Sequence, residues 1–252
     1  MDSRKILEIY KRINDRSIKP VSAWASISDI PPGMLVLGAD GVVKKKVGVG
    51  NFVNNNSTTI QDTITCSFGF ATDVDYDISI VSKIEPGTEV GFFGLFCSGT
   101  AAATGRGVWI ERAGTQNYFT ASLYDSSGFS QSIGGSSITI DNAFHKIRVK
   151  KVSRNIFFSV DDVVKNVSEQ TLTVNSFSQI RIGSQAASRS ITGQIALVRL
   201  VHSDSSQSFC YDFSEGVGNT LVDKCGNGRN GTITDVSPTN FWSTALVPVS
   251  ML

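Results

Sequence analysis

The glutamates and histidines of this 252-residue chain are the first residues to examine for catalysis. A glycosidase needs two carboxylates facing one bond, roughly 5 to 9.5 Å apart. The pair Glu85 and Glu89 flanks Pro86-Gly87, so both glutamates belong to a turn. A nucleophile triad needs a histidine oriented by a carboxylate, but neither His145 nor His202 is accompanied by a Gly-x-Ser-x-Gly sequence. We therefore expect a protein that is not an enzyme.

A second chemistry that spacing suggests is calcium binding. Asp73, Asp75 and Asp77 stand at alternate positions, as at the start of an EF-hand loop. Ile78 and Ile84 stand where that loop needs glycine and glutamate. The structural alternative is a solvated strand face.

The four cysteines do not form a zinc motif, because none of them belongs to a Cys-x-x-Cys pair. Cys66, Cys97 and Cys210 lie in apolar, strand-like runs and are expected as buried free thiols. Cys210 and Cys225 could meet across a loop, although a reducing compartment favours thiols.

The elements that must position these residues are predicted to be strands. Apolar and polar residues alternate, with polar turns between the runs, which is typical of half-buried antiparallel strands. The clearest runs are Phe144–Val149, Asn155–Val160, Ile180–Ile182 and Gly193–Leu200, with a turn at Asp161-Asp162. Others are Val90–Cys97, Gly107–Arg112, Tyr118–Tyr124, Ser137–Ile140 and the alternation from Ile64 to Ile80, which should break near Thr72-Asp73. About a dozen strands suit a two-sheet jelly roll, and removing a central side chain such as Phe157 should cost about 3–5 kcal/mol.

The order of these segments resembles that of laminin-G-like, concanavalin A-like domains. The matching residues are Phe144-His145, Val160-Asp161-Asp162, Ile182-Gly183, the Gly193–Arg199 strand and a second signature from Tyr211 to Thr232. Asp162 stands where the family usually has glycine. The resemblance covers roughly Asn51 to Trp242 and implies an all-β, concanavalin A-like jelly-roll β-sandwich. It says little about function, because this sandwich carries lectins, glycosidases and inert virion modules.

The resemblance also suggests a metal site. It argues against catalysis, because the glutamate motif of the related hydrolases is missing. Related domains bind calcium at sandwich loops, which here suggests Asp212, Asp223 and Asn227; the alternative is that these side chains stabilise turns. Calcium is the only cofactor suggested, and none is required. Hydrolases of the superfamily carry Glu-x-Asp-x-x-Glu or Glu-x-Asp-x-Glu, which no glutamate here begins. Sugar-stacking aromatics would be Trp109, Tyr118, Tyr124 or Trp242, but core packing explains each equally well, so no saccharide site is assigned.

We predict that residues 1–50 form a separate anchoring or oligomerisation segment, which precedes a sandwich over residues 51–252. Residues 2–16 are predicted as a helix whose apolar face consists of Ile6, Ile9, Tyr10 and Ile13. This face could pack on the sandwich, form a bundle with other copies or dock into a larger assembly. A β-hairpin is expected around Gly38–Gly41, and Lys44 to Lys46 are expected as solvated lysines of an edge strand.

Composition and resemblance together lead to two functional hypotheses. The net charge of +1 argues against nucleic-acid binding, no apolar run approaches the roughly 18 residues that span a membrane, and the amino terminus does not read as a secretory leader. The first hypothesis is a non-enzymatic bacteriophage virion structural protein, a head or tail fibre or a capsid decoration. It would be assembled in the host cytoplasm as a homotrimer with other virion proteins and would contact host surface glycans. The alternative is a stand-alone carbohydrate-binding, lectin-type module of a bacterial adhesion system. Deleting residues 1–50 should leave a folded, monomeric sandwich.

Overall fold

The computed structural model describes residues 18–24, 26–52, 62–86, 92–99, 106–113, 118–135, 140–174, 177–184, 191–234 and 241–252. The helix predicted over residues 2–16, with Ile6, Ile9, Tyr10 and Ile13, lies outside these residues. Within them, strands alternate with turns and with the short 3-10 segments η1 (Val21–Ala23), η2 (Ile27–Asp29), η4 (Ser205–Gln207) and η5 (Val249–Met251). No helix of this described part is long and apolar enough to cross a membrane.

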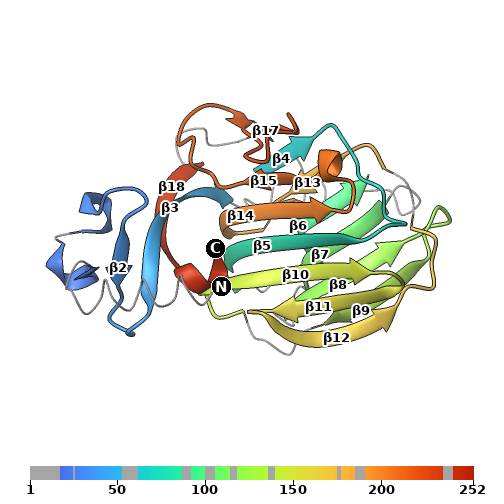
Figure 1. The fold of residues 1–252 in the computed structure, drawn as a ribbon, viewed down its shortest axis with the longest axis horizontal. Helices are drawn as coiled ribbons and strands as arrows, with labels where there is room; N and C mark the ends of the chain where they lie inside the picture. The colour runs from blue at the N-terminus through green and yellow to red at the C-terminus, as the bar shows by residue number, and fades with distance from the viewer. Residues whose placement is uncertain are drawn as a thin grey trace.

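Two sheets pack face to face, and Figure 1 looks onto the larger one, with β6 to β9 behind it. The ten-stranded sheet has the order β1 (Lys19–Pro20), β2 (Leu35–Leu37), β3 (Val43–Phe52), β14 (Gly193–His202), β5 (Tyr76–Ile84), β10 (Phe144–Val152), β11 (Asn155–Val160), β12 (Val163–Glu169), with β15 (Phe209–Tyr211) paired to β14 and β18 (Trp242–Pro248) to β3. The eight-stranded sheet has the order β16 (Thr220–Leu221), β17 (Gly231–Thr234), β4 (Thr63–Cys66), β13 (Ile180–Ile182), β6 (Phe92–Gly99), β7 (Arg106–Ala113), β8 (Tyr118–Tyr124), β9 (Ser130–Gly135). The predicted all-β sandwich is thus confirmed.

The predicted strands agree closely with this architecture. β8 and β11 have the expected bounds, and the break expected near Thr72-Asp73 separates β4 from β5. In the turn after β11, Asp161 and Asp162 both have positive φ, 54° and 62°. A two-residue turn of this left-handed kind matches the twist of a hairpin, and aspartate tolerates it without glycine. The predicted strand Ser137–Ile140 is wrong at Ile140, which lies outside any strand. Residues 137–139 lie outside the described residues.

The choice of Phe157 as a central core residue was wrong. Cross-strand pairing places Phe158 opposite Val149, and both side chains are fully buried between the sheets. Because successive side chains of a strand point to opposite faces, Phe157 lies on the outer face and is only partly buried. The alternation of β11 therefore starts one residue later than the sequence suggested.

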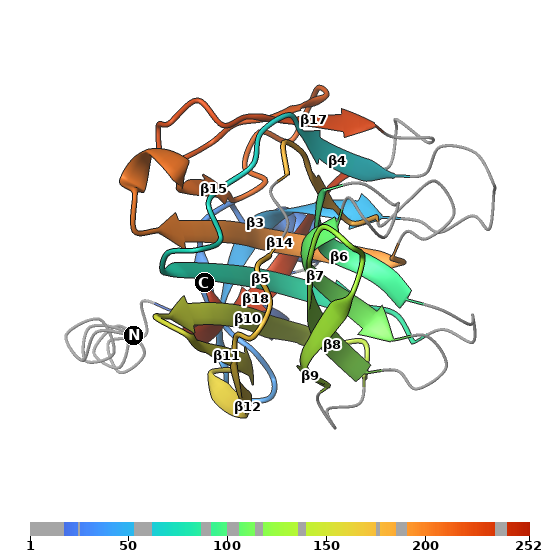
Figure 2. The same cartoon turned by 90° about the vertical axis from the view of Figure 1, so that its right-hand side faces the viewer.

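The edge strands β9 and β12, one from each sheet, lie near one another (Figure 2), and side-chain hydrogen bonds link them. Asn166 and Ser168 donate hydrogen bonds to the carbonyl oxygen of Ile133. In return, Gln131 donates to the Glu169 carbonyl oxygen at 2.6 Å and accepts from the Thr171 N–H at 3.0 Å. Main-chain groups that an edge strand would expose are therefore occupied.

Strand β3 continues across the predicted boundary at residue 50. It pairs with β2 as the expected hairpin, with β18 over residues 44–50 and with β14 over residues 50–52. The division into residues 1–50 and 51–252 stays a prediction, but deleting residues 1–50 would remove the strand against which β18 pairs. At Gly48 an added Cβ would lie 1.9 Å from the carbonyl oxygen of Phe213, so only glycine lets the two backbones approach.

The lysines of β3 do not lie on a free edge, contrary to the expectation. Because β2 and β18 flank β3, Lys46 is buried, and its ammonium donates to the carbonyl oxygens of Ser28 (2.9 Å) and Ile30 (2.5 Å). Lys44 instead pairs with Asp40 at 2.7 Å. Lys46 therefore anchors the segment that precedes β2.

Candidate functional site

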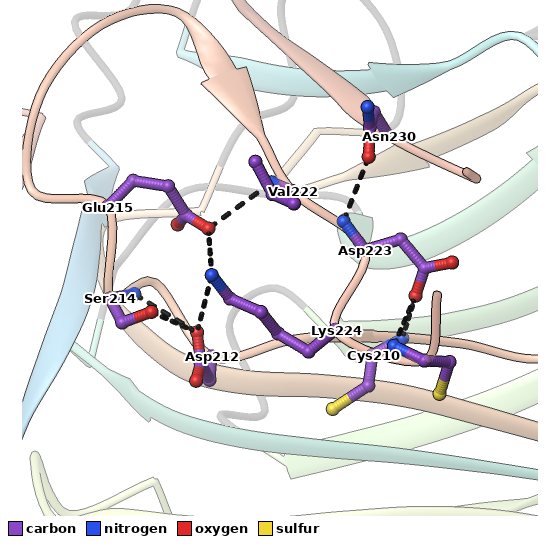
Figure 3. Close-up of polar contacts among 9 residues, drawn as sticks. Cys210, Asp212, Ser214, Glu215, Val222, Asp223, Lys224 and Asn230 are labelled. Atoms are coloured by element: carbon purple, nitrogen blue, oxygen red, sulfur yellow. Dashed lines mark hydrogen bonds and ion pairs between the residues drawn. The ribbon is translucent and has the colours of Figure 1, made fainter. Parts of the chain in front are cut away.

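The loop that contains the predicted metal ligands is organised by the carboxylate of Asp223 (Figure 3). This buried carboxylate accepts four backbone N–H groups, those of Cys210 (3.0 Å) and Cys225 (2.9 Å) on Oδ1 and those of Asn227 (3.0 Å) and Arg229 (3.3 Å) on Oδ2. These are the turn-stabilising bonds of the structural alternative.

The other two predicted ligands have separate partners. Asp212 accepts hydrogen bonds from Ser214, and the Lys224 ammonium lies 2.6 Å from Glu215 and 3.8 Å from Asp212 (Figure 3). The Asn227 side-chain amide donates to the carbonyl oxygens of Ser205 and Ser208. Within the described residues, no group of three or more His, Cys, Asp or Glu side chains is placed to hold a metal ion. Calcium binding by Asp212, Asp223 and Asn227 stays a prediction.

The alternating acidic residues before and within β5 are also engaged by protein groups. The Lys151 ammonium donates to the carbonyl oxygens of Asp73 (2.8 Å) and Val74 (3.1 Å). The Asp75 carboxylate accepts the N–H of Ser153 at 2.7 Å, and Asp77 forms a two-bond ion pair with Arg148.

His145 is held between two carboxylates. Its Nδ1 lies 2.8 Å from Asp161 Oδ2 and its Nε2 lies 2.9 Å from Asp141 Oδ1. Both ring nitrogens donate only in the charged imidazolium, which leaves no lone pair to act as a general base. The hydrogen bond to Asp161 accordingly raises the pKa of His145, and the bond from His145 lowers the pKa of Asp141. This arrangement joins the start of β10 to the β11–β12 turn and is structural.

This clamp predicts a pH-dependent stability. Because the pKa of His145 is raised by folding, its contribution is fully present below its unfolded value of about 6.5 and is lost as the pH rises through the folded pKa. The stabilisation from Asp141 has the opposite pH dependence, because its pKa is lowered by folding: it is fully present above the unfolded pKa and is lost as the pH falls through the folded pKa. The Tm deficit of His145→Gln should therefore be larger by about 2–4 °C at pH 5.5 than at pH 8.5, as about 1 kcal/mol produces in a chain of this size. Thermal unfolding across this range checks it; a deficit independent of pH would contradict it.

The structure also shows the surroundings of the four cysteines and of Trp109. Cys66 and Cys97 are buried and not in a disulfide, as expected, and burial raises the pKa of Cys66 to about 12. Cys210 is partly buried and Cys225 is exposed; both are thiols. Trp109 is fully buried, and its indole N–H donates to the Ser98 carbonyl oxygen at 2.7 Å, so it offers no surface for a sugar.

A polar cleft of about 520 Å³ lies at one end of the sandwich. It is formed by the turn between β10 and β11, by the segment that leads into β5 and by the segment that follows β12. Its lining residues are Thr72, Asp73, Lys151, Ser153, Arg154, Gln170, Thr171, Leu172, Thr173 and Val174. Because they come from three segments distant in sequence, no motif reveals them; the only signal is the polar run from Gln170 to Thr173.

Two residues of the cleft lining carry hydrogen-bonding groups without a partner among the described residues. Gln170 Oε1 is buried and accepts no hydrogen bond within the described residues, whereas its amide nitrogen donates to the Leu172 carbonyl oxygen at 2.8 Å. A buried acceptor without a donor is costly unless something fills it. The Lys151 ammonium uses two of its three N–H groups on carbonyl oxygens, which leaves one donor. Thr171 and Thr173 also line the cleft, and the Thr171 hydroxyl donates to Gln131 Oε1 at 3.2 Å.

A larger cleft of about 660 Å³ beside β18 has a more apolar lining. Its lining includes apolar side chains such as Ile27, Phe144 and Met251. Several of its polar groups already have partners: Asp161 binds His145, Lys44 binds Asp40 and Gln194 binds Asn51. The polar cleft is therefore the better candidate for a ligand that forms hydrogen bonds.

Comparison with known proteins bears on the fold. No protein-family model and no curated protein matches this sequence. Among solved structures, a candidate carbohydrate-binding protein from Bacteroides ovatus is 14% identical, with a TM-score of 0.53 over 82% of this chain and 62% of that one. A SAP-like pentraxin from Limulus polyphemus is 8% identical (TM-score 0.47, 61% of this chain and 75% of that one). Domains LG4-5 of the mouse laminin α1 chain are 15% identical (TM-score 0.47, 69% and 44%). The likeness to the Bacteroides protein shows the fold alone, a β-sandwich of two sheets.

Proposed function

We propose that this chain is a non-catalytic glycan-binding module that takes its ligand in the polar cleft. The observation that carries the proposal is the polar lining of this cleft, which includes Gln170, Thr173 and the Lys151 ammonium with one N–H unused. A sugar ring offers hydroxyls that both donate and accept hydrogen bonds, and such a lining suits them. Lectins are among the proteins that carry the sandwich which the sequence resembles.

The lining of the cleft supports binding rather than hydrolysis. A glycosidase needs two carboxylates across one bond, and Asp73 is the only acidic residue among the described residues that line the cleft. His145 has both ring nitrogens bound to carboxylates. His202 donates from Nε2 to the Ala71 carbonyl oxygen at 2.9 Å and accepts the Asp204 N–H on Nδ1 at 3.0 Å. Neither histidine is available as a base.

Glycan-array binding of the full chain, followed by calorimetry with the best neutral oligosaccharide, tests the proposal. Gln170→Met removes the amide whose bond to the Leu172 carbonyl oxygen shapes the lining, and it should weaken binding at least tenfold, the effect of about 1.4 kcal/mol. Thr173→Val removes an exposed hydroxyl of the lining and should weaken binding severalfold.

The matched control is Thr232→Val, the same change at an exposed position on β17, which should leave affinity unchanged. Thermal unfolding of each variant verifies that the fold is kept. Equal affinities for wild type and Gln170→Met, or no binding to any glycan, would refute the assignment.

The setting of this module stays a prediction. Display on a bacteriophage particle as a fibre or decoration protein, with a homotrimer, virion partners and virion localisation, rests on the sequence resemblance alone. The alternative of a bacterial adhesion module requires the same sandwich. Electron microscopy of the assembly that contains the chain distinguishes them.

A further inference from the structure

Cys210 and Cys225 are held side by side by the turn that Asp223 organises (Figure 3). The backbone N–H groups of the two cysteines donate to the same carboxylate oxygen, Asp223 Oδ1, at 3.0 and 2.9 Å. The Lys224 N–H also donates to the Cys210 carbonyl oxygen at 2.8 Å, so Cys210 on β15 lies against the segment that contains Cys225. Backbones that share one acceptor atom are separated by about the 4.4–6.8 Å between Cα atoms over which a disulfide forms.

The two thiols also lie near the same charged side chain. Cys210 is paired directly with Arg199 across β15 and β14, and directly paired residues present their side chains on one face of a sheet. Burial raises the pKa of both thiols, that of Cys210 to about 11. The charge of Cys225 raises the pKa of Cys210 further, whereas Arg199 lowers the pKa of both cysteines. Such effects weaken with distance, so the two sulfur atoms and the exposed guanidinium of Arg199 are neighbours.

The accessibility of the four cysteines differs in a way that suits stepwise oxidation. Cys225 is exposed, and Cys210 beside it is partly buried. Cys66 and Cys97 are buried in the eight-stranded sheet, where Cys66 Sγ lies 3.2 Å from the Tyr211 hydroxyl. A reagent in solution therefore reaches Cys225 first, and Cys210 is the thiol placed to resolve the product.

We propose that Cys210 and Cys225 are a redox-active pair that closes into a disulfide and thereby fastens β15 to the turn at Asp223. The oxidant is a small-molecule disulfide such as oxidised glutathione. The Cys225 thiolate attacks one of its sulfur atoms, which forms a mixed disulfide and releases one glutathione thiolate. The Cys210 thiolate then attacks Cys225 Sγ and displaces the second glutathione, so two protein thiols are oxidised while one glutathione disulfide is reduced to two thiols. No residue of the polar cleft takes part, so this inference is independent of glycan binding.

Thiol mapping of the full chain tests the pair. The protein is incubated with oxidised glutathione at pH 8.5, where more thiolate is present, and the remaining thiols are alkylated in denaturant. Peptide mass spectrometry should recover Cys210 linked to Cys225, with Cys66 and Cys97 alkylated. Cys210→Ser should instead retain one glutathione on Cys225, because no thiol beside it displaces the adduct. A wild type that keeps this adduct while Cys210 is alkylated, or that does not react at all, would overturn the inference.

Thermal unfolding tests whether the bond stabilises the fold. The Tm of the oxidised wild type should exceed that of the reduced protein by about 5 °C or more, because a cross-link that closes a short loop restricts the unfolded chain. The matched control is the double variant Cys210→Ser, Cys225→Ser, which keeps both buried cysteines and should have the same Tm in oxidised and reduced glutathione. An oxidised wild type no more stable than the reduced one would contradict the fastening role.

Discussion

Replacing Phe158 with alanine is expected to lower the free energy of unfolding by about 3–5 kcal/mol, the usual cost of removing a buried phenylalanine. Phe158 has no exposed surface and lies between the two sheets. Phe157, its neighbour on the outer face of β11, is only partly buried. The same change there should cost about 1 kcal/mol.

Urea unfolding of the two variants gives both values from midpoints and slopes. The two residues share type, strand and sequence neighbourhood, so their difference isolates which face each occupies. Similar losses, or a larger loss at Phe157, would mean that β11 pairs in a register shifted by one residue and would contradict the core described above.

Replacing Asp223 with alanine is expected to cost about 3 kcal/mol or more. Four backbone N–H groups lose their acceptor, and each buried unsatisfied donor costs about 1–3 kcal/mol, reduced where water reaches the turn. Asp212→Ala is the matched change in the same loop. It should cost less than about 1 kcal/mol, because Lys224 keeps its bond to Glu215 and exposed ion pairs contribute little.

Unfolding of both variants in calcium chloride and in EDTA separates the turn-stabilising role of Asp223 from the predicted metal role. The turn-stabilising role requires the same loss at Asp223 in both solutions. A wild-type Tm that drops in EDTA, together with similar losses at Asp212 and Asp223, would instead support a calcium site in this loop.

The sequence predicted the sheet core well because its signal is local. In β10 the alternation of Ile147 and Val149 with charged residues specifies which face is buried, and the structure agrees. The signal failed where adjacent residues have the same character. In Phe157-Phe158, hydrophobicity does not decide which ring points inward; only the register with Val149 does.

The candidate site was not predictable in the same way. Lys151 is one of several lysines of β10, and its buried role depends on the carbonyl oxygens of Asp73 and Val74, far earlier in the chain. The acidic alternation at Asp73 to Asp77 does not reveal this role, because Lys151 contacts main-chain carbonyl oxygens there. Composition alone could not show that a side chain of this protein supplies a positive charge at this turn.

The pairing of β18 with β3 has a consequence for how the protein is made. Most of the polypeptide lies between these two strands in sequence, so β3 cannot acquire this neighbour until residues 242–248 have left the ribosome. Contacts between distant segments slow folding and lengthen the time during which unfinished sheets are exposed to aggregation. Nascent chains arrested before residue 242 should therefore depend on chaperones, and completion of the last strand, rather than formation of the central hairpins, should set when the molecule becomes resistant to proteases.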